Sequence, residues 1–317
     1  DGLKIYTTID SRLQKFAEEA VETHISDLQK VFYNHWEGYT NAPFPEDFEP
    51  EQIDEIIDMA MRRSVRYKRL KSQGKTIDQI RKVFNTKTEM KLFSWNGKRD
   101  TVLSPRDSLV YSKYFLHSGL MSMQPKTGHV KAYVGGINYE NFQYDHVTSG
   151  KRQVGSTFKP FLYSLAIQEG YDPCFQVPNV PVVFDKYKWR LEKDWTPKNS
   201  GSEELEGLTL SLKYGLANSI NTVTAYIMKQ FGPHAVVDLA KKIGVKSKIL
   251  AVPSLCLGTF DLSVCEMVGA YSTFSNKGVW VEPIFVTRIE DKNRVVLERF
   301  IPESNEAMSE ETADIMV

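Results

Sequence analysis

One stretch near the middle of the chain is the most informative about its fold, Gln153-Val154-Gly155-Ser156-Thr157-Phe158-Lys159-Pro160. Gly155 permits a sharp entry into a helix, because a residue without a Cβ tolerates positive φ. Ser156 then falls at or just inside the helix start. Lys159 follows three residues later, so both side chains point to one face, one turn apart. Pro160 is tolerated there, because first-turn amides have no partner within the helix.

Ser156 and Lys159 have the chemistry of a nucleophile and its base. A serine hydroxyl is a weak nucleophile until a base takes its proton. A lysine can be that base when burial and neighbouring positive charge or dipole lower its pKa toward neutrality. The helix N-terminus also favours a developing alkoxide. Taken alone, Ser-x-x-Lys is a common pattern, and a helix-capping serine beside a solvated lysine is the alternative.

A second motif, Ser219-Ile220-Asn221, lies at the junction of two apolar helical stretches. Its hydroxyl and carboxamide can both face a cleft. Ser219 can relay a proton between Lys159 and a leaving amine, and Asn221 can hold Lys159 and a substrate carbonyl. The alternative is plain helix capping by Asn218 or Ser219. Together, the two motifs match the signature of penicillin-binding proteins and class A β-lactamases.

The third element of that signature, Lys-Thr-Gly, has a misleading match at Lys126-Thr127-Gly128. This match precedes Ser156, whereas the signature places it last. It sits between two predicted strands, with Pro125 and Gly128 where a tight turn needs them. We therefore predict a hairpin turn here. No later Lys-Thr-Gly occurs before Val317, so the sequence is expected to stop short of that strand.

Strands near both ends, with helices between them, predict an α/β (α+β) fold in which helices surround an antiparallel sheet. The predicted strands are Leu3–Ile9, Leu120–Gln124, Val130–Val134 and a pair within Val279–Phe300. The predicted helices follow Asp10 and Ser156, span Thr209–Ala217, start near Asn221 and span Pro233–Ile243, with a Pro-rich loop at Pro173–Pro197.

Residues 34–103 differ in composition from the rest of the chain, and this difference predicts an inserted helical and hairpin subdomain. A loop is followed by a long helix from Glu51 toward Lys71, which Gly74 ends. The remaining signals are a capping box at Thr76–Gln79 and an Asn96-Gly97 hairpin within Met90–Leu103. A helix opened by Ser104-Pro105 follows the insert.

The formal net charge is zero over 317 residues, which argues against nucleic acid as a main partner. No stretch approaches the roughly 20 apolar residues of a membrane span. The chain opens on Asp1-Gly2-Leu3 without a signal peptide, so we expect a piece of something longer. Cys174, Cys256 and Cys265 lack metal-type spacing and are expected to be free, although Cys256 and Cys265 could pair. We expect no metal and no cofactor.

Several ordered stretches resemble the transpeptidase part of class A, bifunctional penicillin-binding proteins, over nearly the whole chain apart from the insert. They are Tyr6–Asp10 with Leu13-Gln14, Pro125–Gly136, Arg152–Pro160, Trp195–Asn199, Thr209-Leu210, Ala217–Asn221 and Glu266–Gly278. The resemblance implies the penicillin-binding protein transpeptidase and serine β-lactamase-like fold. It also implies three regions: a linker with the first elements of the domain (1–33), the insert (34–103) and a C-terminally incomplete transpeptidase domain (104–317).

The resemblance implies a peptidoglycan D,D-transpeptidase that β-lactams acylate. Ser156 would attack the penultimate D-alanine carbonyl of a stem peptide, and its amide would donate to the oxyanion. Lys159 is the implied general base, Ser219 the proton relay, and Asn221 the residue that positions Lys159 and substrate. The implied location is the cell envelope, at the periplasmic face of the cytoplasmic membrane. The family's membrane anchor and glycosyltransferase domain are absent here, so we expect no glycan polymerisation by this chain.

Two alternatives stay open. A β-lactamase-like hydrolase would need a deacylating carboxylate, for which Glu203, Glu204 and Glu206 are candidates in a polar loop. A non-catalytic β-lactam sensor or scaffold would keep Ser156 and Lys159 without peptide turnover. Residues 34–103 could dock envelope proteins or serve as a passive spacer.

Overall fold

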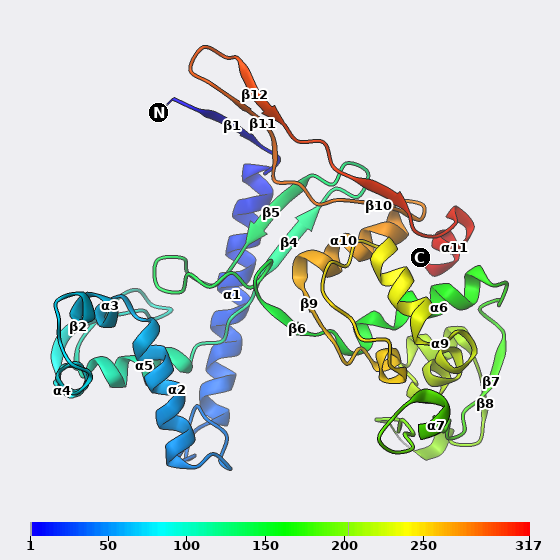
Figure 1. Ribbon diagram of the computed structural model, residues 1–317, viewed down its shortest axis with the longest axis horizontal. Helices are drawn as coiled ribbons and strands as arrows, with labels where there is room; N and C mark the ends of the chain where they lie inside the picture. Colours follow the sequence, from blue (N-terminus) through cyan, green and yellow to red (C-terminus); the bar gives the residue numbers. More distant parts are fainter. Residues whose placement is uncertain (1, 202) are drawn as a thin grey trace. The chain divides into compact units, whose positions relative to one another are not determined.

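The computed structural model describes residues 2–201 and 203–317, except for the side chain of Glu203. The chain forms two compact units (Figure 1). The first unit comprises Asp1–Glu18, Gly119–Gly136 and Tyr144–Val317. The second unit comprises Glu19–Ser118 and Ile137–Gln143. Residues 34–103 fall inside the second unit, and the boundaries set for them from the sequence stay a prediction.

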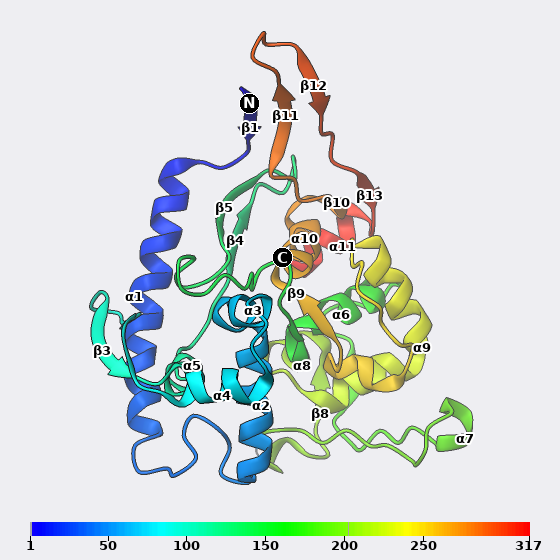
Figure 2. The ribbon, with the colours of Figure 1, turned by 60° about the vertical axis from the view of Figure 1, so that its left-hand side comes forward.

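The described strands of the first unit pair in antiparallel fashion, as predicted, and one isolated parallel bridge joins His129 to Ile284. The three-stranded sheet has the order β1 (Lys4–Thr7), β11 (Val286–Glu290), β12 (Val296–Arg299). Figure 2 shows β11 and β12 as a long hairpin. The described two-stranded pairs are β4 (Leu120–Met123) with β5 (Val130–Val134), β6 (Lys151–Gln153) with β9 (Asp261–Ser263), β7 (Gln176–Pro178) with β8 (Thr209–Ser211), and β10 (Val279–Val281) with β13 (Ser304–Glu306).

Apolar helices form the core of the first unit. Its longer helices are α6 (Lys159–Gln168), α8 (Leu212–Ala217), α9 (Asn221–Lys242), α10 (Val264–Ser275) and α11 (Glu310–Met316). Its short ones are η1 (Gly155–Phe158), α7 (Lys186–Trp189), η2 (Glu203–Leu205) and η3 (Pro253–Leu257). Helix α6 packs along α9, and Phe161, Leu162, Val223 and Met228 are fully buried there. This packing fixes the N-terminal ends of α6 and α9, where the candidate site lies.

Three predictions in the first unit were partly wrong. The loop predicted over Pro173–Pro197 contains strand β7 and the short helix α7. The helix predicted over Thr209–Ala217 begins three residues late, because Leu210 pairs with Val177 in a strand and Ser211 then caps α8. The strand pairing predicted within Val279–Phe300 holds for β11 and β12. However, β10 pairs with β13, which lies beyond the predicted stretch.

The second unit is helical with one hairpin. It contains the later part of α1 (Ser11–His35) and all of α2 (Pro50–Arg63), α3 (Val65–Ser72), α4 (Ile77–Asn85), β2 (Thr88–Leu92), β3 (Arg99–Leu103) and α5 (Pro105–Lys113). The long helix predicted from Glu51 toward Lys71 is two helices. Ser64 has an extended backbone, and its hydroxyl accepts a bond from Tyr67 N at 3.1 Å, which starts α3 afresh. The capping box at Thr76 and the Asn96-Gly97 hairpin are confirmed.

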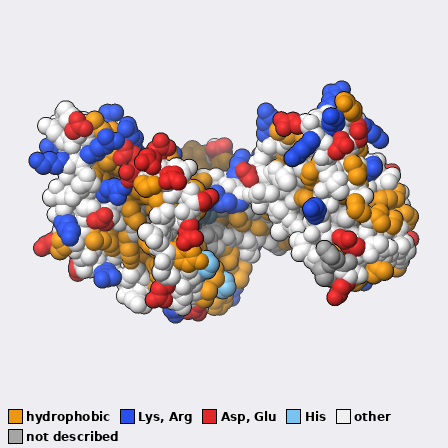
Figure 3. All heavy atoms as spheres, turned by 90° about the horizontal axis from the view of Figure 1, so that it is seen from below, with side chains coloured by type: hydrophobic (Ala, Val, Ile, Leu, Met, Phe, Trp, Pro, Cys, Tyr) orange, Lys and Arg blue, Asp and Glu red, His pale blue; other side chains and the backbone are white. Residues whose placement is uncertain are grey.

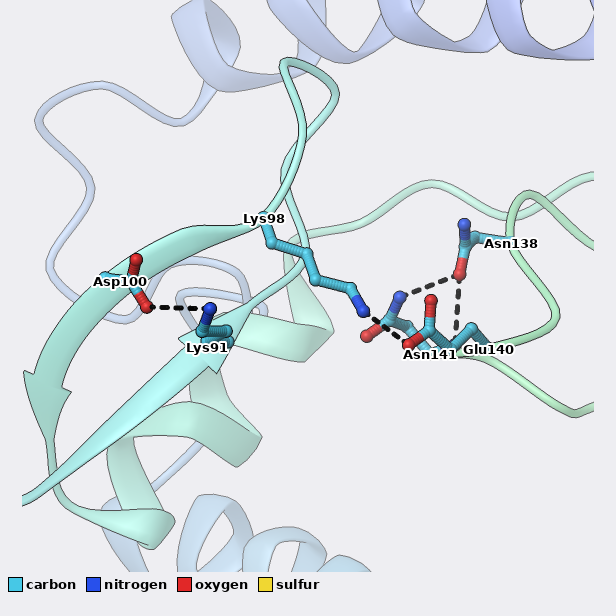
Figure 4. A network of polar contacts seen from close by, with 6 residues as sticks. All are labelled: Lys91, Lys98, Asp100, Asn138, Glu140 and Asn141. Carbon is cyan, nitrogen blue, oxygen red and sulfur yellow. Dashed lines mark hydrogen bonds and ion pairs between the residues drawn. The ribbon is translucent and has the colours of Figure 1, made fainter.

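A polar network joins the segment Ile137–Gln143 to the hairpin of β2 and β3 (Figure 4). Lys98, in the hairpin, pairs with Glu140 at 2.5 Å. Asn138 Oδ1 accepts bonds from the amide and side chain of Asn141 at 3.0 and 2.7 Å. The ring of Phe142 also packs against Phe93 and Phe115, so this segment, although distant in sequence, contacts the second unit through both an ion pair and apolar rings.

The second unit also has an open cleft of about 920 Å³ beside α2, α4 and α5. Two ion pairs lie in its lining, Arg81 with Asp58 and Arg106 with Asp54. Figure 3 shows acidic side chains gathered close to basic and hydrophobic ones in its left-hand part. Among the described helices, none is both long and apolar enough to cross a membrane. The three cysteines are free, as expected.

Candidate active site

Ser156 lies in η1, the 3₁₀ turn directly before α6. Gly155 has φ +55°, so the sharp entry predicted for this glycine is present. The amide of Lys159 donates to the carbonyl of Ser156, which fixes the two residues one tight turn apart. Ser156 itself is exposed. A 3₁₀ turn thus presents the serine to solvent and then leads into a buried helix.

The nucleophile turn is held from outside by a close approach of two glycines. Gly155 N donates to Gly258 O at 3.0 Å. A Cβ on Gly258 would stand 2.0 Å from the carbonyl oxygen of Gly155. Only a residue without a side chain therefore fits at position 258. The strand pairing of β6 with β9 and the bond from Val154 N to Phe260 O at 3.1 Å continue this attachment.

Lys159, the first residue of α6, is only 1% exposed and contacts the second motif directly. Its Nζ lies 2.7 Å from Ser219 O, 3.0 Å from Ser219 Oγ and 2.6 Å from Asn221 Oδ1. The structure thus brings Lys159, Ser219 and Asn221 into one cluster. Among the described residues, no side-chain hydrogen bond links Ser156 to this cluster.

Burial is the main influence on the charge of Lys159. Removal from water disfavours the ammonium form and lowers the pKa of Lys159 to about 8. The Cys256 thiol is 2% exposed, and burial raises its pKa to about 12. The thiol is therefore protonated near neutral pH and supplies no thiolate to hold a proton on Lys159.

Ser219 occupies the loop between α8 and α9 with φ +55°, a left-handed conformation that costs a non-glycine residue about 1–2 kcal/mol. In this conformation both its carbonyl and its hydroxyl reach Lys159 Nζ. The neighbouring Asn218 caps α8 instead, through a bond from its Nδ2 to Tyr214 O at 3.0 Å. The capping alternative therefore applies to Asn218 and not to Ser219.

Sequence reasoning missed two residues that support the nucleophile turn. Tyr271, on α10, donates from its hydroxyl to Thr157 O at 2.5 Å. Gly258 makes the close approach described above. Neither has a motif of its own, although Tyr271 lies within the stretch Glu266–Gly278 that resembles the family. Neither the close approach of Gly258 to Gly155 nor the hydrogen bond of Tyr271 can be inferred from residue spacing.

The rejected Lys126-Thr127-Gly128 match lies in the turn between β4 and β5, as predicted. Gly128 has φ +69°, and its amide donates to Gln124 O at 3.0 Å. Of the carboxylates considered for a hydrolase, Glu204 and Glu206 are exposed, and the side chain of Glu203 lies outside the described part of the chain.

Two family models match the chain. One, described as penicillin-binding protein middle domain, covers residues 39–116, and the other, described as penicillin binding protein transpeptidase domain, covers residues 119–317. Penicillin-binding protein 1A of Aquifex aeolicus (strain VF5) is 30% identical over 319 residues. That alignment covers 96% of this chain but only 41% of the Aquifex protein, so the chain spans well under half of this curated relative.

Solved structures show the same fold. Penicillin-binding protein 1A from Haemophilus influenzae matches with a TM-score of 0.65 and 20% identity, over 99% of this chain and 53% of that chain. Penicillin-binding protein A from M. tuberculosis, solved as its imipenem acyl-enzyme complex, matches with a TM-score of 0.52 and 17% identity. That match covers 63% of this chain and 55% of the other.

Proposed function

This chain belongs to the class A penicillin-binding proteins, with their middle and transpeptidase domains, and from that membership we propose that it is a D,D-transpeptidase. Its substrates are peptidoglycan stem peptides, which it cross-links through an acyl-enzyme on Ser156. One observation carries the proposal: a buried lysine amine, with a pKa lowered to about 8, lies one 3₁₀ turn after an exposed serine and against Ser219 and Asn221.

The chemistry follows from these contacts. Neutral Lys159 takes the proton of Ser156 Oγ as that oxygen bonds to the penultimate D-alanine carbonyl carbon. The amide of Ser156, in the first turn of a helix, is a donor for the resulting oxyanion. The C–N bond then breaks, and the leaving D-alanine amine receives the proton from Lys159 through Ser219 Oγ. Asn221 Oδ1 holds the amine of Lys159 in place during both transfers.

The second half-reaction runs through the same groups. An amine from a neighbouring stem peptide attacks the ester carbon and gives up a proton toward Lys159. The ester C–O bond breaks, Ser156 Oγ regains a proton, and a new peptide bond remains. A β-lactam acylates Ser156 in the same way, because opening of its ring also breaks a C–N bond. The resulting fragment stays attached, so no leaving amine departs.

We also propose that the protein works at the periplasmic face of the cytoplasmic membrane, where stem peptides lie, and that residues 34–103 serve as a docking surface for envelope proteins. The charged cleft of the second unit supports the latter. Cell fractionation tests the location.

The deciding experiment labels the full gene product with fluorescent penicillin and then measures intact mass. We expect a stable adduct on Ser156 in the wild type, none in Ser156→Ala, and D-alanine release from a stem pentapeptide. Absence of an adduct in the wild type would contradict the proposal. Rapid loss of the adduct with drug hydrolysis would identify a β-lactamase, and a stable adduct without D-alanine release would identify a sensor.

A further inference from the structure

The first turn of α9 has no cap from its own N-cap residue. That residue is Ile220, whose side chain cannot accept a hydrogen bond. The first amides of a helix need partners from outside it. Asn199 supplies one, because its Oδ1 accepts bonds from Asn221 N at 2.9 Å and from Thr222 N at 3.2 Å. A residue 22 positions away in sequence therefore caps the helix that begins with Asn221.

The residue before Asn199 sets which way the Asn221 side chain faces. Asn221 Nδ2 donates to Lys198 O at 2.7 Å. Because the amide group is planar, this bond turns Oδ1 toward Lys159 Nζ, 2.6 Å away. Reversal of the amide would place an NH₂ group against the lysine amine and remove its acceptor. The pair Lys198-Asn199 thus controls both the position and the orientation of Asn221.

Asn199 is itself held in a buried network. Its Nδ2 donates to Asn179 Oδ1 at 3.0 Å. Asn179 is 2% exposed, and its own Nδ2 donates to Leu205 O at 2.6 Å. The buried hydroxyl of Thr222 also donates to Asn179 Oδ1. In each side-chain amide of this network the oxygen accepts a hydrogen bond and the nitrogen donates one. Asn199 can therefore make all of its hydrogen bonds in only one orientation.

We propose that Asn199 is a positioning residue for acyl transfer, which holds Asn221 against Lys159 by capping α9. Among the described residues, Asn199 has no hydrogen bond to Ser156 or Lys159, so it acts through Asn221. The inference rests on the proposed function, because acylation of Ser156 is its readout. A cap that only stabilises the helix would change the free energy of unfolding and leave the chemical step intact.

The test uses the full gene product and fluorescent penicillin, with the binding constant Ks and the acylation rate constant k2 measured separately. We expect Asn199→Ala to lower k2 roughly 10- to 100-fold with Ks unchanged, since small misplacements of catalytic groups cost rates of this order. Asn221→Ala is expected to lower k2 as well. The double variant should then be no slower than Asn221→Ala alone, because both changes remove the same contact, that of the Asn221 side chain with Lys159.

The matched control is Ser309→Ala, which removes the bond from Thr312 N to Ser309 Oγ at 3.1 Å that caps α11. This variant should have a lower thermal stability, because a helix cap is lost, and its k2 should equal that of the wild type. If Asn199→Ala does not fold, Asn199→Ser repeats the test with a side chain too short to reach both amides. The proposed role of Asn199 would be overturned if a folded Asn199 variant kept wild-type k2. It would also be overturned if the loss of k2 in the double variant equalled the product of the two single losses. Wild-type protein without an adduct on Ser156 would instead overturn the proposed function.

Discussion

Two opposing influences act on the amine of Lys159. Burial disfavours the ammonium form, whereas three oxygen atoms within 3.0 Å can accept its hydrogens. Burial is the larger influence, and the pKa falls to about 8. Near that pH the amine can both accept and release a proton at little cost, which is what a residue that acts first as base and then as acid requires.

The acylation rate is therefore expected to follow the deprotonation of Lys159. Below its pKa the ammonium has no lone pair for the proton of Ser156, so the rate should fall about tenfold per pH unit. Above about pH 8 the amine is neutral and the rate should level off. The measurement is k2/Ks for fluorescent penicillin from pH 6 to 9.5, with circular dichroism at each pH to check folding. A flat profile over this range would contradict a base role for Lys159.

At the scale of elements, the position of Ser156 depends on a second segment that follows it by about a hundred residues. The turn η1 is attached through Gly258, through the pairing of β6 with β9 and through Tyr271 on α10. All three attachments come from residues 258–271. The helix α6 then begins at Lys159 and is fixed by its packing on α9. The ring of Phe161 on α6 also contacts Tyr271, so the nucleophile turn and the helix of its base share a support on α10.

Gly258→Ala is expected to disturb the nucleophile turn specifically. Its Cβ would meet the carbonyl of Gly155 at 2.0 Å, and the backbone φ of +67° disfavours a side chain. We expect at least a tenfold loss of k2 for fluorescent penicillin, because displaced catalytic groups lose rates of that order. The control is Gly170→Ala, at φ +89° with no atom within 4 Å of the added Cβ. It should cost about 1–2 kcal/mol of stability and leave k2 unchanged. Equal acylation by both variants would show that the close approach is not needed.

Elements set by neighbouring residues could be predicted from the sequence. The capping box at Thr76, the hairpin at Asn96-Gly97 and the helix opened by Ser104 each depend on residues within a few positions. Strand β8 could not be predicted, because its character comes from pairing with β7, about 30 residues earlier in the chain. The break at Ser64 was missed because the apolar pattern continues across it.

The same distinction holds for the candidate site. The two short motifs, taken together and compared with the family signature, singled out Ser156, Lys159, Ser219 and Asn221. The bond from Lys159 to the Ser219 carbonyl depends on a left-handed backbone that no residue type signals. The cap that Asn199 provides depends on a loop folding back over 22 positions. Contacts between distant segments are set by the packing of the whole unit, and spacing does not report them.

At the scale of the whole molecule, the chain forms two units whose segments alternate along the sequence. Each unit has its own buried cluster: Phe161 and Ile227 belong to the first, Ile80 and Phe84 to the second. The proposed catalytic residues all lie in the first unit. Separate cores allow the two units to lose structure at different denaturant concentrations, in which case a single two-state description would fail.

Matched core substitutions test this division. Ile80 is 1% exposed and Ile227 is 2% exposed, and Ile227 lies in α9, the helix that carries Asn221. Each change to alanine should cost about 2–5 kcal/mol, because it leaves a cavity in a packed core. Ile80→Ala should lower the urea concentration at which proteases cleave the second unit. The urea concentration at which penicillin labelling is lost should stay unchanged. Ile227→Ala should shift the loss of labelling instead. If Ile80→Ala moved the labelling transition as far as Ile227→Ala does, the two cores would have to unfold together, and the alternating segments of the chain would couple them into one cooperative structure.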